Sequence, residues 1–308
     1  MSTKETCDAV LIMGFGGPTR ADQVRPFLDA MVRGRPIPRE RYEEVVHHYE
    51  QLGGRSPYND LTMRQAEALR EELAKKGARI PVAVGMRNWE PYLADSIRAL
   101  AGSGARRVLG FIMAAHRSEA SFERYQATVS DACDALGEAA PEFVYPPPWH
   151  DHPLFIAAVA SRTREAYARL DDDERPRAQL IFTAHSIPLA MAQAGPYVEQ
   201  LSDSARMVAA ELGIGAWQIA YQSRSGSPRE AWLEPDIKQT IRSLEAKTAV
   251  VVPIGFLCDH VEVLYDLDIE AADIARAAGI RMERAPTVGD HPSFIEMMAS
   301  IIAPYARR

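Results

Sequence analysis

The feature that most constrains the fold is a regular alternation of short apolar runs with longer amphipathic stretches. Eight runs have the length and composition of β-strands, at about 8–13, 80–85, 107–113, 142–145, 178–184, 217–221, 247–254 and, more weakly, 281–283. Helical periodicity lies between them, at about 20–31, 39–51, 60–76, 91–101, 118–138, 152–169, 197–212, 234–245, 260–277 and 291–304. Alternation of this kind predicts an α/β fold with parallel sheets covered by helices on both faces.

The strands divide equally between two halves of the chain. The segment "YPPPWHDHP" (145–153) is too rich in proline to be helical. We therefore expect two similar doubly wound, Rossmann-like domains, each with a four-stranded parallel sheet, at 1–150 and 151–308. The last helix, at about 291–304, could pack back on the first domain.

Composition and charge exclude several classes of protein. The net charge of −7 disfavours a general nucleic-acid binder or a protein held to anionic lipid by charge alone. The three cysteines are widely scattered, which suits a reducing compartment, and we expect a cytoplasmic protein. No apolar run approaches the roughly 18 residues of a transmembrane helix, so at most peripheral membrane contact is expected. The sequence ends at "IIAPYARR", so we expect no membrane-anchoring extension.

A histidine stands at the predicted end of a core strand. In "FTAHSIP" (182–188), His185 follows the apolar run directly. Ligands of open parallel sheets bind at the carboxyl ends of the strands, which makes His185 a candidate site residue. The alternative is a half-buried histidine that caps the next helix or bonds a loop carbonyl.

A row of acids follows the strand at 247–254. In "DHVEVLYDLDIE", Glu262, Asp266 and Glu270 recur at every fourth residue, and we call these three side chains the carboxylate row. On an α-helix they would span roughly an 80° sector and climb about 6 Å per step. Such a row can guide a hard divalent cation or protons, whereas the alternative is a solvated acidic face. Asp259 is positioned to cap this helix.

His185 and Glu262 occupy equivalent places in successive βα units, each just past the end of a strand. They are therefore expected to face each other across one crevice. A histidine beside a carboxylate can bind a divalent transition metal, move protons near neutral pH, or do both.

Two further segments have weaker signals. "GFGGPT" (14–19) lacks the last glycine of a dinucleotide-binding loop and has Pro18 where the helix should begin, so we favour a turn that lets backbone approach a flat ligand. "VRGRPIPRERY" (32–42) places four arginines in an acidic protein. It is either a solvated basic loop or a site for a ligand with carboxylates.

Taken together, these residues resemble those of the ferrochelatases, which insert ferrous iron into a porphyrin in haem biosynthesis. The resemblance covers nearly the whole chain. It rests on "GFGGPT", "YEQLGGRSPYNDLT" (49–62), "GMRNWEPY" (85–92), "FTAHSIP", "AYQSRSGSPREAWLEPDI" (220–237) and "PIGFLCDHVEVLYDLDIE" (253–270), which occur in the family's order and approximate spacing.

The resemblance implies roles for individual residues. His185 and Glu262 become the catalytic, metal-facing pair, and Asp266 and Glu270 extend the metal path outward. Phe15 faces the other side of the macrocycle, where it cannot ligate iron. Arg87, Asn88 and Trp89 would shape the pocket wall, with a structural role for Trp89 as the alternative.

Cofactors and substrates follow from the same resemblance. Ferrous iron and a porphyrin are substrates, and no resident cofactor is required. Many relatives carry a [2Fe–2S] cluster on four cysteines, but only three cysteines are present here, so no cluster is expected. Protein partners are not indicated by the sequence.

The basic segment suggests which porphyrin is used. It resembles the segment of family members that take coproporphyrin III, a porphyrin with four propionates, and the alternative substrate is protoporphyrin IX. The implied propionate contacts are Arg33, Arg35, Tyr49, Ser56 and Tyr125. Two other functions remain open: a cobalt or nickel chelatase for a sirohydrochlorin-type macrocycle, and a non-catalytic haem-binding protein on the same scaffold.

Overall fold

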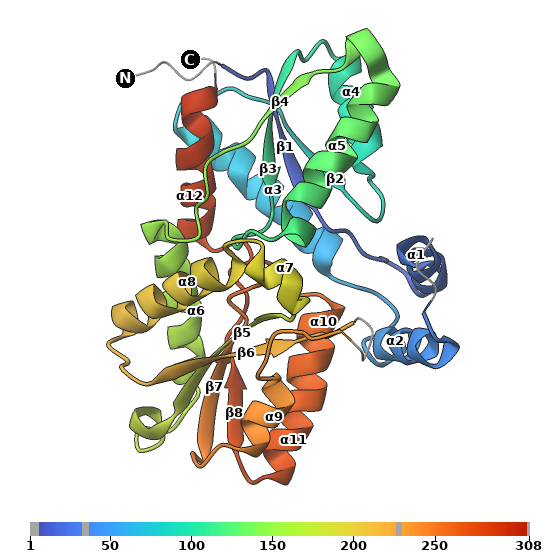
Figure 1. Ribbon diagram of the computed structural model, residues 1–308. Helices are drawn as coiled ribbons and strands as arrows, with labels where there is room; N and C mark the ends of the chain where they lie inside the picture. The colour runs from blue at the N-terminus through green and yellow to red at the C-terminus, as the bar shows by residue number, and fades with distance from the viewer. Residues whose placement is uncertain (1–5, 33–36, 226–229, 307–308) are drawn as a thin grey trace. The chain divides into compact units, whose positions relative to one another are not determined.

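The chain was analysed as a computed structural model, which describes residues 6–32, 37–225 and 230–306 (Figure 1). It divides into two compact units. Unit 1 comprises Met1–Met113, Ala120–Pro147 and Phe294–Arg308, and unit 2 comprises Ala114–Glu119 and Pro148–Ser293. Each unit contains one four-stranded sheet whose strands are all parallel. The predicted α/β class with two such sheets is thereby confirmed.

The sheet of unit 1 has the strand order β2-β1-β3-β4. Its strands are β1 (Ala9–Gly14), β2 (Val82–Met86), β3 (Arg107–Ile112) and β4 (Glu142–Val144). Helices α3 and α4 pack on β1 and β2, and α4 also packs on α5. The helices are α1 (Val24–Met31), α2 (Arg39–Gln51), α3 (Tyr58–Lys75), α4 (Leu93–Gly102) and α5 (Glu123–Leu136), with short 3-10 turns η1 (Ala21–Gln23), η2 (Glu119–Ser121), η3 (Gly137–Ala139) and η6 (Ala303–Tyr305).

The last helix, α12 (Pro292–Ile302), joins unit 1 from Phe294 onward. Glu296 on this helix lies 3.9 Å from the Lys76 ammonium at the end of α3. The Cys7 amide donates to the carbonyl of Tyr305 at 2.7 Å, so the first and last segments that the structure describes meet beside β1.

The sheet of unit 2 has the strand order β6-β5-β7-β8. Its strands are β5 (Gln179–His185), β6 (Trp217–Gln222), β7 (Thr248–Val252) and β8 (Arg281–Arg284). The helical elements are α6 (Pro153–Tyr167), η4 (Arg175–Arg177), α7 (Leu189–Gln193), α8 (Tyr197–Leu212), α9 (Ile237–Arg242), α10 (Val261–Val263), η5 (Leu264–Ala271) and α11 (Ala272–Ala277).

Two groups of helices pack on this sheet. Helices α6 and α8 pack together and against β6, β7 and β8, while α9 packs on β6, η5 and α11. Between β5 and β7 the strand order reverses, because the chain leaves β5 toward β6 and then returns to β7 on its other side. In open α/β sheets this reversal leaves a crevice at the carboxyl ends of the two strands, which is where ligands bind.

The helical stretch after β7 differs from the predicted α-helix. Residues Leu264–Ala271 form a π-helix, η5, between α10 and α11. Val263, Leu267 and Ala271 each follow an acid of the row by one residue, and Ala275 continues their spacing of four. All four are fully buried in the core. A repeat of four exceeds the 3.6 residues of an α-helical turn, and the wider π turn keeps such rows aligned.

The structure also contains α7, a short helix that the sequence analysis did not predict. No helix among the described residues is both long enough and apolar enough to cross a membrane.

Candidate active site

His185 is the last residue of β5, and its backbone is held from two sides. The Tyr197 hydroxyl donates to the His185 carbonyl at 2.9 Å, and the Ser186 amide donates to the Gln222 carbonyl at 2.8 Å. The imidazole Nδ1 lies 2.5 Å from the Ser186 carbonyl oxygen. Because a carbonyl only accepts, Nδ1 carries a hydrogen in this contact, and Nε2 is directed to other partners.

Glu262 comes to the same crevice from the loop after β7. Gly255 in that loop lies against Ala184 of β5, where an added Cβ would approach the Ala184 Cβ to 2.5 Å, so only glycine fits. The helix cap is His260, whose Nδ1 accepts the Glu262 amide at 3.2 Å. The predicted cap, Asp259, is wrong, because its carboxylate binds Arg284 instead.

The two side chains form a pair at the point where the strand order reverses. His185 Nε2 lies 3.6 Å from Glu262 Oε2, and the side chains are 30% and 41% exposed. Burial favours the neutral imidazole, but the nearby Glu262 carboxylate and the Ser186 carbonyl outweigh it, so the pKa of His185 is raised. The pair therefore holds a proton readily and is open to solvent or a ligand.

The middle acid of the carboxylate row is held by a serine. Ser223, just after β6, donates its hydroxyl to the Asp266 carboxylate in a short hydrogen bond. Ser223 has φ 61°, the left-handed region that non-glycine residues rarely adopt, so the backbone is strained to place this hydroxyl. Burial raises the pKa of Asp266 to about 7, with further contributions from Glu262 and Glu270, although the Ser223 hydrogen bond opposes the shift.

The outer acid of the row is paired with a lysine. Glu270 Oε2 lies 3.2 Å from the Lys238 ammonium, which extends from the first turn of α9. Asp268, which is off the row, binds Arg284 of β8 together with Asp259. The other acids of this segment are thus neutralised by Arg284, whereas the row has its own partners, His185 at Glu262, Ser223 at Asp266 and Lys238 at Glu270.

The four predicted metal ligands do not surround one point. Among the residues that the structure describes, no group of three or more His, Cys, Asp or Glu side chains is close enough to hold a metal ion. The arrangement is one His–Glu pair continued by two acids in sequence. It suits an ion or a proton in transit better than a resident metal.

The predicted porphyrin contacts that lie in unit 1 include one exposed ring. Phe15, just after β1, is 37% exposed, and its backbone is fixed by hydrogen bonds with Tyr58 and Asn88. The Arg87 guanidinium lies 5.4 Å from the centroid of the Phe15 ring and 4.8 Å from that of Tyr125. Gly16 follows at φ 86°, in close contact with Met86 and Trp89, where a larger residue would clash.

The remaining predicted contacts are more enclosed. Tyr49 and Ser56 are each 3% exposed, and Tyr49 packs edge-on against Phe27. Tyr125 is also buried, which raises the pKa of its phenol to about 12 and leaves it a neutral hydroxyl. Arg33 and Arg35 lie outside the described residues. All five propionate contacts stay predictions.

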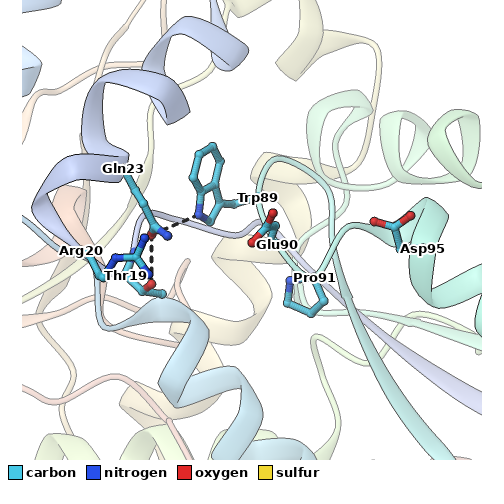
Figure 2. A pocket seen from close by; sticks show the side chains of 7 residues that line it. All are labelled: Thr19, Arg20, Gln23, Trp89, Glu90, Pro91 and Asp95. Atoms are coloured by element: carbon cyan, nitrogen blue, oxygen red, sulfur yellow. Dashed lines mark hydrogen bonds between the residues drawn. The ribbon is translucent and has the colours of Figure 1, made fainter.

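Trp89 is held by contacts within unit 1. Its indole packs edge-on against Phe27 at 5.7 Å, and its Nε1–H donates to Gln23 Oε1 at 3.4 Å. Figure 2 shows this contact in the wall of a cavity of about 480 Å³. The cavity is lined by Thr19, Arg20, Gln23, Trp89, Glu90, Pro91 and Asp95.

Sequence reasoning missed Ser223, Lys238 and Arg284. Ser223 lies within a motif that the resemblance used, "AYQSRSGSPREAWLEPDI", but nothing in that motif indicates a left-handed residue facing an acid. Lys238 is distant from Glu270 in sequence, and Arg284 is distant from Asp259 and Asp268, so only the fold brings each to its partner.

This architecture, with a His–Glu pair at the reversal of the strand order, defines an α/β protein of the chelatase fold. The structure of "SirB from Bacillus subtilis with Fe3+" superposes with a TM-score of 0.60 over 98% of this chain and 96% of that chain, at 12% sequence identity. A cobalt complex of the sirohydrochlorin chelatase SirB from Bacillus subtilis subspecies spizizenii gives 0.58 at 13% identity and the same coverage. At such identities the likeness establishes the fold alone.

The sequence comparisons establish the family. The ferrochelatase family model matches residues 7–305. The ferrochelatase of Rhodopirellula baltica is 39% identical over 98% of this chain and 87% of its own length. The coproporphyrin III ferrochelatase of Mycolicibacterium smegmatis is 41% identical over 96% of this chain and 88% of its own length. The chain belongs to the ferrochelatase family and is an enzyme of haem biosynthesis, a lyase that forms nitrogen–metal bonds.

Proposed function

We propose that this ferrochelatase inserts ferrous iron into coproporphyrin III to give coprohaem III, with His185 and Glu262 as the residues that act at the ring centre. The observation that carries the site assignment is the 3.6 Å pair between them at the reversal of strand order in unit 2. The coproporphyrin III ferrochelatases among the relatives, at about 40% identity, support the choice of porphyrin.

The reaction exchanges one Fe²⁺ for two protons. The porphyrin loses both inner N–H protons, and its four nitrogens then bind the metal. Each proton needs an acceptor, and Glu262 is an acceptor beside an imidazole that already favours its protonated form. Asp266, with a pKa of about 7, accepts and releases protons near neutral pH and can pass them outward along the row.

The ring must bend for its nitrogens to direct lone pairs toward an incoming ion. A site that binds the bent ring better than the flat ring lowers the barrier to insertion. The exposed Phe15 ring, with the Arg87 guanidinium beside it, offers a packing surface that cannot ligate iron. An axial ligand to the product would then come from His185.

We propose no resident cofactor. A [2Fe–2S] cluster needs four ligands, which are cysteines in the relatives that carry it, and the three cysteines here cannot supply four thiolates. Ferrous iron enters as substrate. We further propose that the protein works in the cytoplasm, with at most peripheral membrane contact, as the scattered cysteines and the absence of a long apolar run suggest.

The choice of porphyrin is tested by an anaerobic assay with ferrous iron that compares coproporphyrin III with protoporphyrin IX in the same detergent. We expect kcat/KM to favour coproporphyrin III by roughly 10–100-fold, because two additional propionates each gain about 1 kcal/mol or more at a partly exposed arginine. Equal or better use of protoporphyrin IX would overturn the substrate assignment.

The arginines outside the described residues are tested in the same assay. The double substitution Arg33→Gln/Arg35→Gln should reduce the preference, and raised salt should reduce it in the wild type, since exposed charges are screened over about 10 Å at 0.1 M. The matched control is Arg39→Gln/Arg41→Gln on α2, where the Arg41 guanidinium already binds Glu44 at 2.7 Å. This control should retain the preference.

A further inference from the structure

The outer end of the carboxylate row carries a cation of its own. The Lys238 ammonium lies 3.2 Å from Glu270 Oε2, and both side chains are about a third exposed. Its positive charge also lowers the pKa of Asp266, against the larger effect of burial. Lys238 therefore acts on two of the three acids in the row.

The position of Lys238 is fixed by the fold rather than by the needs of its helix. Its amide donates to the capping carboxylate of Asp236 at 2.8 Å, and its neighbours Ile237 and Ile241 are buried in the core together with Val263 and Leu267. A positive side chain in a first turn is unfavourable to the helix dipole. Packing of α9 against η5 is what places this ammonium beside Glu270.

The inner end of the row, at Glu262, has beside it a hydrogen-bond acceptor without a partner among the described residues, whereas the outer end has a cation. Gln222, at the end of β6 beside His185, is 1% exposed, and its side chain donates Nε2–H to the Glu262 backbone carbonyl at 2.9 Å. Its carbonyl oxygen, Oε1, is buried and finds no hydrogen-bond partner in the described part of the chain. An acceptor left over beside the His–Glu pair suits an incoming donor or cation, whereas the outer acid is already neutralised.

We propose that Lys238 is a specificity-determining residue that competes with divalent cations for Glu270, so that an ion entering along the row must displace the ammonium. This deepens the proposed function and rests on it, with iron reaching the His–Glu pair along the metal path that the family resemblance implies for Asp266 and Glu270. A lysine suits this task because its charge is compact and its stem is flexible, so it can leave one carboxylate without disturbing the backbone.

Competition of this kind acts unequally on different ions. Mg²⁺ and Mn²⁺ prefer oxygen ligands and would be held by the outer acids. Ferrous iron also binds imidazole well and gains a nitrogen ligand when it reaches His185. Lys238 lowers the affinity of the outer position at Glu270 for every divalent cation. This loss falls fully on a cation that binds only there, and less on ferrous iron, which moves on to His185.

The test is equilibrium binding of Mn²⁺ to the full-length protein without porphyrin, measured by electron paramagnetic resonance. Lys238→Met keeps the length of the side chain and removes its charge, Lys238→Arg keeps the charge, and Lys247→Met is a control at an exposed lysine before β7. We expect Lys238→Met to tighten Mn²⁺ binding about three- to tenfold at 0.1 M salt, as removal of one screened charge about 6 Å from a divalent ion implies. Lys238→Arg and Lys247→Met should stay within twofold of the wild type.

Steady-state assays supply the second measurement. Lys238→Met should lower the apparent KM for ferrous iron without raising kcat, and should make added Mn²⁺ a stronger inhibitor. In the Glu270→Gln background the effect of Lys238→Met on Mn²⁺ binding should fall to less than half, because the contested carboxylate is then neutral and only the weaker influence of Lys238 on Asp266 remains.

Mn²⁺ binding that is unchanged or weaker in Lys238→Met would overturn the proposal, and so would a full effect of Lys238→Met in the Glu270→Gln background. Both results are read without porphyrin. A wild type that prefers protoporphyrin IX would refute the proposed substrate and leave the Mn²⁺ result intact, so the two failures are distinguishable.

Discussion

His185 Nε2 and Glu262 Oε2 lie 3.6 Å apart although their positions differ by 77 in the sequence. The reason is that β5 and β7 are adjacent and parallel, so the chain leaves both strands at the same edge of the sheet. Gly255 allows the β7 loop to come against Ala184, and His260 caps the short helix that carries Glu262. The pair is therefore a product of main-chain packing, and substitutions of its side chains should leave the fold intact.

The first prediction concerns this pair. His185→Ala and Glu262→Gln should each lower the rate of iron insertion by roughly 10²–10⁴-fold, the loss typical of removing a proton-transfer group. Porphyrin binding, followed by the shift of the Soret band on titration, should be largely retained. Near-normal turnover in either purified variant would remove that residue from the proposed mechanism.

The outer acids should behave differently from the inner pair. Asp266→Asn and Glu270→Gln should raise the apparent KM for ferrous iron more than they reduce kcat, since they lie further along the path. Initial rates over a range of iron concentrations at saturating porphyrin measure the two parameters separately. If iron dependence is unchanged in both variants, the outer two acids are a solvated helix face.

Asp266 also gives a prediction on stability and pH. Its pKa is raised from 3.8 to about 7 in the folded chain, so between these values the native state holds a proton that the unfolded chain releases. The resulting stabilisation is complete below about pH 4 and is lost as the pH rises through 7. The Asp266→Asn variant should not show this loss of stability, because the amide of asparagine does not titrate.

Urea unfolding at pH 5 and pH 8 measures the difference. The free energy of unfolding should fall between these values by on the order of 1–3 kcal/mol more in the wild type than in Asp266→Asn. Asp273→Asn, at an exposed acid of α11 paired with Arg276, is the control and should follow the wild type. A parallel pH dependence in Asp266→Asn would mean that the carboxyl is not shifted.

The parts of the fold that depend on local pattern were predictable from the sequence. All eight strands lie where the apolar runs place them, and the ends of parallel strands bring His185 and Glu262 to one edge. The π geometry of η5 did not follow from helical periodicity, which implies α-helical turns, although the two rows with a repeat of four, at 262–270 and 263–275, carry the signal. The partners of the row were beyond prediction. Ser223 and Lys238 reach Asp266 and Glu270 from the end of β6 and from α9, and no local pattern encodes that. The same holds for Arg284 of β8, which binds the neighbouring Asp259 and Asp268.

Ser223 combines a strained backbone with a hydrogen bond to Asp266, and two substitutions separate the effects of the two. Ser223→Gly relieves the left-handed backbone but removes the hydroxyl, whereas Ser223→Ala removes the hydroxyl and keeps the strain. Both variants should raise the KM for iron to a similar degree, because both lose the hydrogen bond to Asp266. Ser223→Gly should unfold at a higher urea concentration than Ser223→Ala, and its free energy of unfolding should be larger by on the order of 1 kcal/mol. Equal stability of the two would show that the φ angle of Ser223 stores no strain.

The last prediction concerns Arg284, which joins three separate segments. From β8 its guanidinium binds Asp259, in the loop after β7, and Asp268, in η5, and its side chain is only 14% exposed. Arg284→Met would leave two partly buried carboxylates without their cation. Breaking a buried pair in this way costs about 3–5 kcal/mol, and the exposure of Asp268 reduces the expected loss to about 2–3 kcal/mol. Arg284→Lys keeps the charge but loses the two-sided fork, and should recover part of the stability. Because η5 also carries Asp266 and Glu270, loosening it should raise the KM for iron in Arg284→Met.

The control for Arg284 is Arg276→Met, which removes an exposed arginine that binds Asp273. It should cost about 0.5 kcal/mol or less of stability, with no effect on KM. Urea unfolding and iron titrations of the three variants test this, and an Arg284→Met protein as stable as Arg276→Met would show that the fork does not hold η5 in place.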